Sequence, residues 1–251
     1  MMEVIMEELW NGFEIKRMEF EGYDACIVFP KEGTANGKLM IKTEYWDAFP
    51  NAIEVPLLKQ GFHLCFVKSD NRWASEDQLD RKARFVRYVC KEYGLSERTV
   101  PVGMSCGGLV AVKFAAKYPE LVSCLYLDAP VMNYMSCPCG FGTGDALVGE
   151  GYDGIKEVLD ALQMSGISEL ICYREMPMDK IPVLVKNRVP VALVVGGSDM
   201  VVPFHENGIL LKNAYEQAGL DLAFAIKPEC AHHPHGLDDP TEMVEFILQH
   251  S

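Results

Sequence analysis

The sequence predicts one α/β domain, in which a mostly parallel central sheet is flanked by helices. Short, nearly continuous apolar runs alternate along the chain with amphipathic helical patterns, which is typical of a sheet covered on both faces. The 251 residues are 49% hydrophobic and 24% charged, enough to bury a large core and to exclude a disordered chain. No internal repeat or low-complexity linker divides the chain, so residues 1–251 are expected to form a single domain.

The predicted strands are apolar runs that follow one another at the spacing of strand–helix units. They are residues 25–29, 39–41, 63–67, 99–103, 124–127, 191–195 and 222–226. Most of these runs are apolar at successive positions rather than at alternate ones, so we expect helices on both sides of the sheet.

The helical patterns between these runs carry their own stop signals. Residues 76–93 place apolar side chains on one helical face, and Gly94 follows. Residues 205–218 do the same, and Gly219 follows. The last helix is predicted to begin at Pro240, because proline is favoured in the first turn of a helix.

One interval departs from this rhythm. About 60 residues separate the run ending at Pro130 from the run starting at Pro190, far more than the roughly dozen residues of a usual crossover. The interval holds a glycine-rich stretch and a short amphipathic helix at 155–162. We interpret residues 131–189 as an insertion that covers a site at the rim of the sheet, with an ordinary extra helix–strand pair as the alternative.

The net charge of the chain limits the classes of molecule that it is expected to bind. The 23 basic and 36 acidic side chains give a net charge of −13, which disfavours binding to nucleic acid or to anionic membrane surfaces. No apolar stretch is long enough to span a membrane. Residues 1–10 hold three glutamates and no basic residue, the reverse of a secretory leader. We therefore expect a soluble, cytoplasmic protein.

Cysteine usage agrees with a reducing compartment. Nine cysteines are scattered along the chain, mostly within apolar runs, where a thiol behaves as a small hydrophobic group. Only Cys137 and Cys139 are closely spaced, and they lack the second pair that a structural zinc site needs.

The strongest functional signal is the pentapeptide Gly103-Met104-Ser105-Cys106-Gly107. It lies between the predicted strand 99–103 and a helical stretch at 109–118, so the serine occupies a tight strand-to-helix turn whose flanking positions have little room for side chains. This placement predicts a nucleophilic Ser105, with the Cys106 side chain packed into the helix. Pro101 is unusual inside such a strand, because proline lacks a ladder donor.

A serine nucleophile needs a base and an orienting carboxylate. Asp199 follows the strand 191–195, and His232 follows the strand 222–226, so both lie at the same rim of the sheet as Ser105. Asp128, at the end of the run 124–127, is an alternative acid, and His233 and His235 are alternative bases. The three histidines also raise the possibility of zinc, but the sequence shows no carboxylate or thiolate partner beyond Cys230, so we expect no metal and no cofactor.

Taken together, the serine turn, the Gly-Ser-Asp-x-Val-Val-Pro segment and the His-x-Pro-His segment before a final helix resemble the α/β-hydrolase superfamily, most closely its esterases and lipases. The chain order Ser, Asp, His is that of this superfamily. The resemblance implies Ser105 as nucleophile, Asp199 as acid and His232 as base, with residues 131–189 as a cap after strand 6 of the fold. Where related sequences usually have a glycine before the catalytic histidine, this chain has Ala231, which keeps His233 as an alternative.

The resemblance further implies an oxyanion hole. One donor is expected to be the backbone amide of Cys106. The second is expected to be the amide of Thr43 in the segment Lys42-Thr43-Glu44, where many relatives have His-Gly.

These residues predict a serine hydrolase that cleaves a small-molecule carboxylic ester with a small acyl group through an acyl-enzyme. The alternatives are acyl transfer, or amide or C–C bond hydrolysis, by the same residues, and a non-catalytic binding protein on a hydrolase scaffold.

Overall fold

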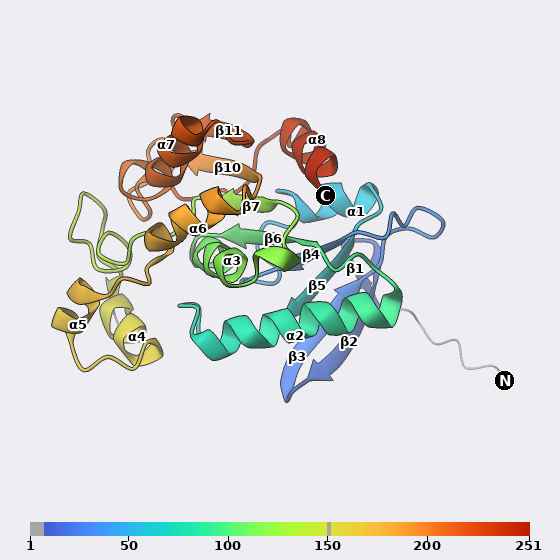
Figure 1. The fold of residues 1–251 in the computed structure, drawn as a ribbon, viewed down its shortest axis with the longest axis horizontal. Helices are drawn as coiled ribbons and strands as arrows, with labels where there is room; N and C mark the ends of the chain where they lie inside the picture. Colours follow the sequence, from blue (N-terminus) through green and yellow to red (C-terminus); the bar gives the residue numbers. More distant parts are fainter. Residues whose placement is uncertain (1–7, 150–151) are drawn as a thin grey trace.

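A nine-stranded sheet forms the centre of the molecule (Figure 1). The computed structural model describes residues 8–149 and 152–251, so most of the acidic stretch 1–10 and two residues of the predicted cap lie outside the described residues. Across the sheet, the strand order is β1-β2-β3-β5-β4-β6-β7-β10-β11. The strands from β5 to β11 in this order pair in parallel, whereas β1, β2, β3 and β5 pair antiparallel.

All seven predicted strands are confirmed, with bounds within two residues of those expected. The strands are β1 Leu9–Trp10, β2 Phe13–Phe20, β3 Tyr23–Val28, β4 Leu39–Lys42, β5 His63–Val67, β6 Thr99–Met104, β7 Leu125–Asp128, β8 Val148–Gly149, β9 Tyr152–Asp153, β10 Val191–Gly196 and β11 Leu222–Lys227. The prediction omitted β1 and β2 and the small β8–β9 hairpin. Because β2 is an edge-side strand, it alternates buried and exposed side chains at its start instead of forming a continuous apolar run.

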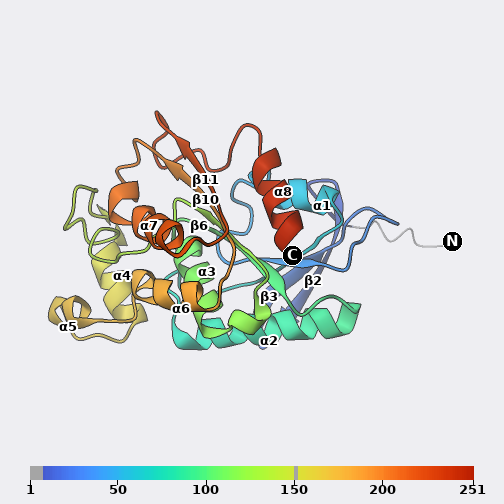
Figure 2. The same ribbon diagram turned by 45° about the horizontal axis from the view of Figure 1, so that its top comes forward.

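Helices cover both faces of the sheet. They are α1 Glu54–Lys59, α2 Glu76–Tyr93, α3 Cys106–Lys117, α4 Gly154–Ala161, α5 Ile167–Cys172, α6 Ile181–Lys186, α7 Gly208–Ala218 and α8 Thr241–His250, with short 3₁₀ turns at Pro119–Leu121, Pro177–Lys180 and Phe204–Glu206. Figure 2 shows α8 beside α1, and Figure 1 shows α4 and α5 together at the end of the molecule farthest from α1 and α8. None of the helices within 8–149 and 152–251 is both long enough and apolar enough to cross a bilayer.

The sheet has a hydrophobic core on each face, and the side chains of successive β4 residues point into one core and then the other. Leu39 and Ile41 pack with α2 and α3 on one face, whereas Met40 packs with α1 and α8 on the other. The helix ends follow the expected chemistry, because Gly94 and Gly219 adopt the left-handed conformation that ends α2 and α7. The last helix begins at Thr241, one residue later than predicted, and Pro240 is its N-cap.

Pro101 is accommodated within the central strand β6. The carbonyl of Val102 faces β4, where it accepts a hydrogen bond from Thr43, so the Pro101 nitrogen faces β7. On that side, the paired positions are an isolated bridge between Thr99 and Val122 and a ladder that starts at Val102. The missing N–H therefore lies between paired positions.

A buried ion pair attaches α1 to the sheet. The Lys42 ammonium contacts the Glu54 carboxylate and donates to the Ala48 carbonyl at 3.1 Å, and both charged side chains are 1% exposed. Removing one partner of such a pair leaves the other charge buried without compensation.

We therefore expect Glu54→Ala to lower the free energy of unfolding by about 3–5 kcal/mol, measured by urea denaturation. The control is Glu21→Ala, which removes the exposed partner of Arg84 and is expected to cost less than about 1 kcal/mol. Equal losses in the two variants would contradict a special role for the buried pair.

Candidate active site

Ser105 occupies a strained turn between β6 and α3. Its backbone angles are φ 53° and ψ −121°, in the left-handed half of conformational space that non-glycine residues rarely adopt. The amide of Ser105 donates to the Asp128 carbonyl at 2.9 Å, and its carbonyl accepts from the Val131 amide at 3.1 Å. The turn is thereby fastened to the end of β7.

Close packing explains the glycines around this serine. A Cβ atom at Gly103 would lie 2.4 Å from the Gly107 carbonyl oxygen, and one at Gly108 would lie 2.5 Å from Cβ of Pro130. A Cβ at Gly107 would be only 3.2 Å from Oγ1 of Thr43, a milder conflict. The steric need is therefore greatest at Gly103 and at Gly108, and Gly108 lies just outside the predicted pentapeptide.

Three residues from different loops meet at this turn. Nε2 of His232 lies 3.0 Å from Oγ of Ser105, and Nδ1 of His232 lies 2.8 Å from Oδ2 of Asp199. Because an ionised carboxylate only accepts hydrogen bonds, Nδ1 carries the proton and Nε2 is left to accept the serine hydroxyl. All three residues lie past the carboxyl ends of parallel strands, β6, β10 and β11.

Asp199 is held as a carboxylate. Its other oxygen, Oδ1, accepts the amides of Val201 and Val202 at 2.8 Å each. Burial raises the pKa of the Asp199 carboxyl, but the hydrogen bonds from His232 and from these two amides outweigh burial, so the pKa lies below its ordinary value.

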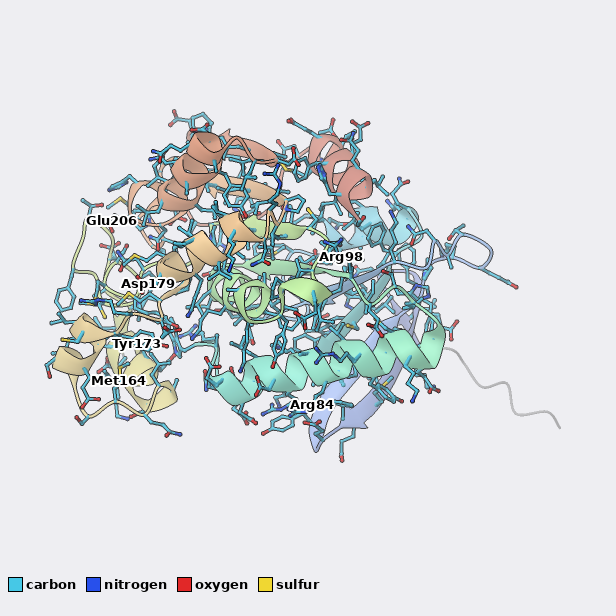
Figure 3. The ribbon with its side chains drawn as sticks, in the orientation of Figure 1. Arg84, Arg98, Met164, Tyr173, Asp179 and Glu206 are labelled. Carbon is cyan, nitrogen blue, oxygen red and sulfur yellow. The ribbon has the colours of Figure 1, made fainter. Side chains whose placement is uncertain are left out.

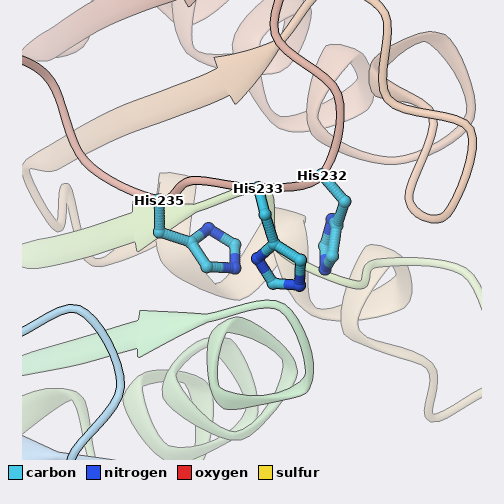
Figure 4. A group of neighbouring side chains, drawn as sticks. All are labelled: His232, His233 and His235. Carbon is cyan, nitrogen blue, oxygen red and sulfur yellow. The ribbon is translucent and has the colours of Figure 1, made fainter.

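The alternative residues lie outside this hydrogen-bonded chain. Asp128 accepts from Nδ1 of His235 at 2.7 Å and from the Gly236 amide at 2.6 Å, so it is engaged with a different histidine. His233 is exposed, and its ring stacks on Phe49 with centroids 5.4 Å apart. Figure 4 shows the three histidines side by side on one loop.

Cys106 is buried at the start of α3, and burial raises the pKa of its thiol to about 11. The thiol is therefore neutral at pH 7, which argues against it as the nucleophile. Its backbone amide belongs to the first turn of the helix, whose N–H groups have no acceptor within the helix.

Thr43, the predicted second oxyanion donor, is engaged in the sheet. Its amide donates to the Val102 carbonyl at 3.1 Å, and its hydroxyl contacts the carbonyls of Val102 and Gly107. An amide that extends the β4–β6 ladder is not free to bind a substrate oxygen.

Tyr45, two residues further along, was not anticipated from the sequence. Burial is the main factor that raises the pKa of its hydroxyl; the neighbouring Cys106 thiol raises it further, and the nearby Arg72 lowers it. Its backbone is also strained, with φ 57°. The only sequence signal for Tyr45 is its position just after the strand that precedes the expected oxyanion loop.

Residues 131–189 are hydrogen-bonded to several elements that surround the site. Asn207 accepts the amides of Met132 and Asn133 with its side-chain oxygen, at 2.9 and 3.1 Å. Glu206, labelled in Figure 3, accepts the Thr143 hydroxyl at 2.7 Å, within the glycine-rich stretch. Arg72 donates to Glu157 of α4 at 2.8 Å.

Comparisons with known proteins agree with this architecture. Residues 61–163 match the family model described as alpha/beta hydrolase fold. A candidate esterase from Staphylococcus aureus superimposes with a TM-score of 0.68 at 13% identity, over 96% of this chain and 84% of that protein. Among curated proteins, none matches the chain.

Several longer peptidases also superimpose on the chain. Pyrococcus horikoshii acylaminoacyl peptidase gives a TM-score of 0.65 at 14% identity, over 88% of this chain and 37% of the peptidase. Porphyromonas gingivalis dipeptidyl peptidase 4 gives 0.63 at 17% identity, over 95% and 35%. The chain thus spans less than two fifths of the length of these two peptidases.

The lowered pKa of Asp199 predicts a pH-dependent stability. A carboxyl whose pKa is depressed on folding stabilises the folded state above its ordinary pKa, 3.8, and this contribution is lost as the pH falls through the lower value. We expect Asp199→Asn to be less stable than the unmodified chain by an amount that is constant above about pH 5 and shrinks on further acidification. Urea denaturation at a series of pH values measures the difference, and a gap that widens in acid would contradict it.

Proposed function

Because this chain has the α/β-hydrolase fold, we propose that it is a serine hydrolase that cleaves carboxylic esters. The observation that carries the proposal is the continuous hydrogen-bonded chain from the Ser105 hydroxyl through His232 to Asp199. A hydroxyl, an imidazole and a buried carboxylate in this order are the parts that activate a serine for acyl transfer.

In the proposed reaction, Nε2 of His232 takes the proton of Ser105 while Oγ attacks the ester carbonyl. Asp199 stabilises the imidazolium that forms, and its two amide bonds hold it in place. The imidazolium returns its proton to the leaving alcohol as the C–O bond breaks, which leaves an acyl-serine. Water then attacks the acyl group with His232 as base, which releases the acid and restores the serine.

The oxyanion requires two donors, which we assign to the amide of Cys106 and the hydroxyl of Tyr45. The Tyr45 hydroxyl lies near Cys106, the residue next to the nucleophile, and its O–H can rotate toward a substrate oxygen, whereas the Thr43 amide is fixed in the β4–β6 ladder. A phenolic O–H is a suitable donor, because its raised pKa keeps it protonated.

We propose that the acyl group is small. The glycine-rich stretch of the 131–189 segment packs against the loop that carries Asp199, since Cβ atoms at Gly142 and Gly144 would meet Glu206, Met200 and Pro203. Buried apolar side chains of α4 and α5, Val158 and Leu170, belong to the core. These features favour a short acyl chain over a long one.

Amide hydrolysis is the second candidate, because several structural neighbours are peptidases. The same residues would serve, with an amine as the leaving group. Parallel assays of short p-nitrophenyl esters and the matching p-nitroanilides separate the two candidates.

The central test is labelling by a fluorophosphonate probe followed by peptide mapping. We expect the probe on Ser105, with labelling lost in Ser105→Ala and His232→Ala and kept in His233→Ala. Ester turnover should fall on the order of 10⁶-fold in the first two variants. Unchanged turnover in folded Ser105→Ala would disprove the assignment, and loss of labelling in His233→Ala alone would transfer the role of base to His233.

A second test concerns the oxyanion donor. We expect Tyr45→Phe to lower kcat about 10²- to 10³-fold, because one transition-state hydrogen bond is lost, with little change in KM. The matched control is Tyr88→Phe, an exposed tyrosine on α2. A kcat within twofold of the unmodified chain would exclude Tyr45 as a donor.

A further inference from the structure

Three histidines of the loop between β11 and α8 form a compact triangle. The ring centroids of His232, His233 and His235 lie 4.8, 5.0 and 5.0 Å apart, and each ring offers one nitrogen within 4.8 Å of the other two (Figure 4). A tetrahedral zinc site places its nitrogen ligands about 3.4 Å apart. Binding a tetrahedral ion would require these nitrogens to move closer together, and the exposed His233 has the most freedom to turn.

Two of these histidines are backed by buried carboxylates. Asp199 lies 2.8 Å from Nδ1 of His232, and Asp128 lies 2.7 Å from Nδ1 of His235. Each carboxylate fixes the proton on Nδ1, so in both rings the lone pair is on Nε2. Metal-binding histidines are oriented by carboxylates in the same way. From the sequence, zinc was disfavoured because no carboxylate was evident as a further ligand. The two carboxylates of the fold lie behind the rings, where they orient His232 and His235.

The charges also suit a divalent cation. The Asp128 and Asp199 side chains are 2% and 1% exposed, so their field is only weakly screened by solvent. Two buried carboxylates behind three neutral imidazoles would balance a charge of +2. Three imidazole nitrogens favour zinc or a similar first-row transition metal over magnesium or calcium, which prefer oxygen.

We propose that His232, His233 and His235 form a binding site for a divalent transition-metal ion, and that occupancy switches off the serine. The ion would take the Nε2 lone pair of His232, the same pair that accepts the Ser105 proton. Removing the ion would restore the base, so the inhibition is reversible. The inhibition rests on the proposed hydrolase function, whereas the metal site itself does not.

Direct binding tests the site without any assay of activity. Chelator-stripped protein is titrated with Zn²⁺ by calorimetry, and one equivalent is expected to bind both to the unmodified chain and to Ser105→Ala. His233→Ala and His235→Ala should weaken binding at least tenfold, and Asp128→Asn about 10- to 100-fold through loss of the carboxylate behind His235. His205→Ala, which changes a histidine in the 3₁₀ turn Phe204–Glu206, is the control and should bind as the unmodified chain does.

His235 is buried, so its variant is compared by thermal unfolding, and the exposed His233 provides the variant that is safe for folding. Absence of stoichiometric binding, or equal weakening by His205→Ala and His233→Ala, would overturn the proposal.

The inhibitory role is tested by fluorophosphonate labelling, first in the presence of Zn²⁺ and then after addition of excess chelator. Labelling should fall with Zn²⁺ and recover with the chelator. Zn²⁺ binding to a chain that never labels would uphold the metal site and refute the hydrolase. Labelling without Zn²⁺ binding would do the reverse.

Discussion

Asp128, the last residue of β7, is the point on which the geometry of the site depends. Its backbone carbonyl accepts the Ser105 amide, and its carboxylate accepts His235 and the Gly236 amide. One residue therefore fixes the serine turn and the histidine loop relative to each other. Because a hydrogen bond to a buried carboxylate is stronger than one between neutral groups, the histidine loop is held firmly against the end of the sheet. His232 lies on this loop, so its position depends on Asp128 as well.

This anchoring offsets a local cost. A non-glycine residue with positive φ costs on the order of 1–3 kcal/mol, and Ser105 is one such residue. The turn persists because hydrogen bonds fasten both its amide and its carbonyl, while Gly103 and Gly108 let β6, α3 and Pro130 approach closely. The strain lifts the hydroxyl above the end of the sheet, where a base on a neighbouring loop can reach it.

How much the sequence could predict depended on the range of the interactions. The parallel strands were predictable because burial on both faces leaves continuous apolar runs, and α2 and α7 because glycines end them. The hydrogen-bonded chain of Ser105, His232 and Asp199 was expected from the motifs. The contact of Asp128 with His235 was not, because residues 107 positions apart carry no local signal of their pairing. Thr43 was misjudged for a related reason, since only the β4–β6 register shows that its amide is occupied.

The 131–189 segment and the reacting centre share side chains, which links their positions. Arg72 donates to Glu157 of α4 at 2.8 Å and also lies near the Tyr45 hydroxyl, and each of the two groups shifts the pKa of the other. Asn207 precedes α7 and accepts the amides of Met132 and Asn133 in the segment after β7. Along the chain, Asn207 follows the loop of Asp199 and the 3₁₀ turn Phe204–Glu206. A displacement of α4 would therefore move Arg72 relative to Tyr45. A displacement of the segment after β7 would move Asn207 and, with it, the loop that carries Asp199. Coupling of this kind requires only shared hydrogen-bond partners, because a partner that moves must either carry its neighbour with it or leave a buried polar group unsatisfied.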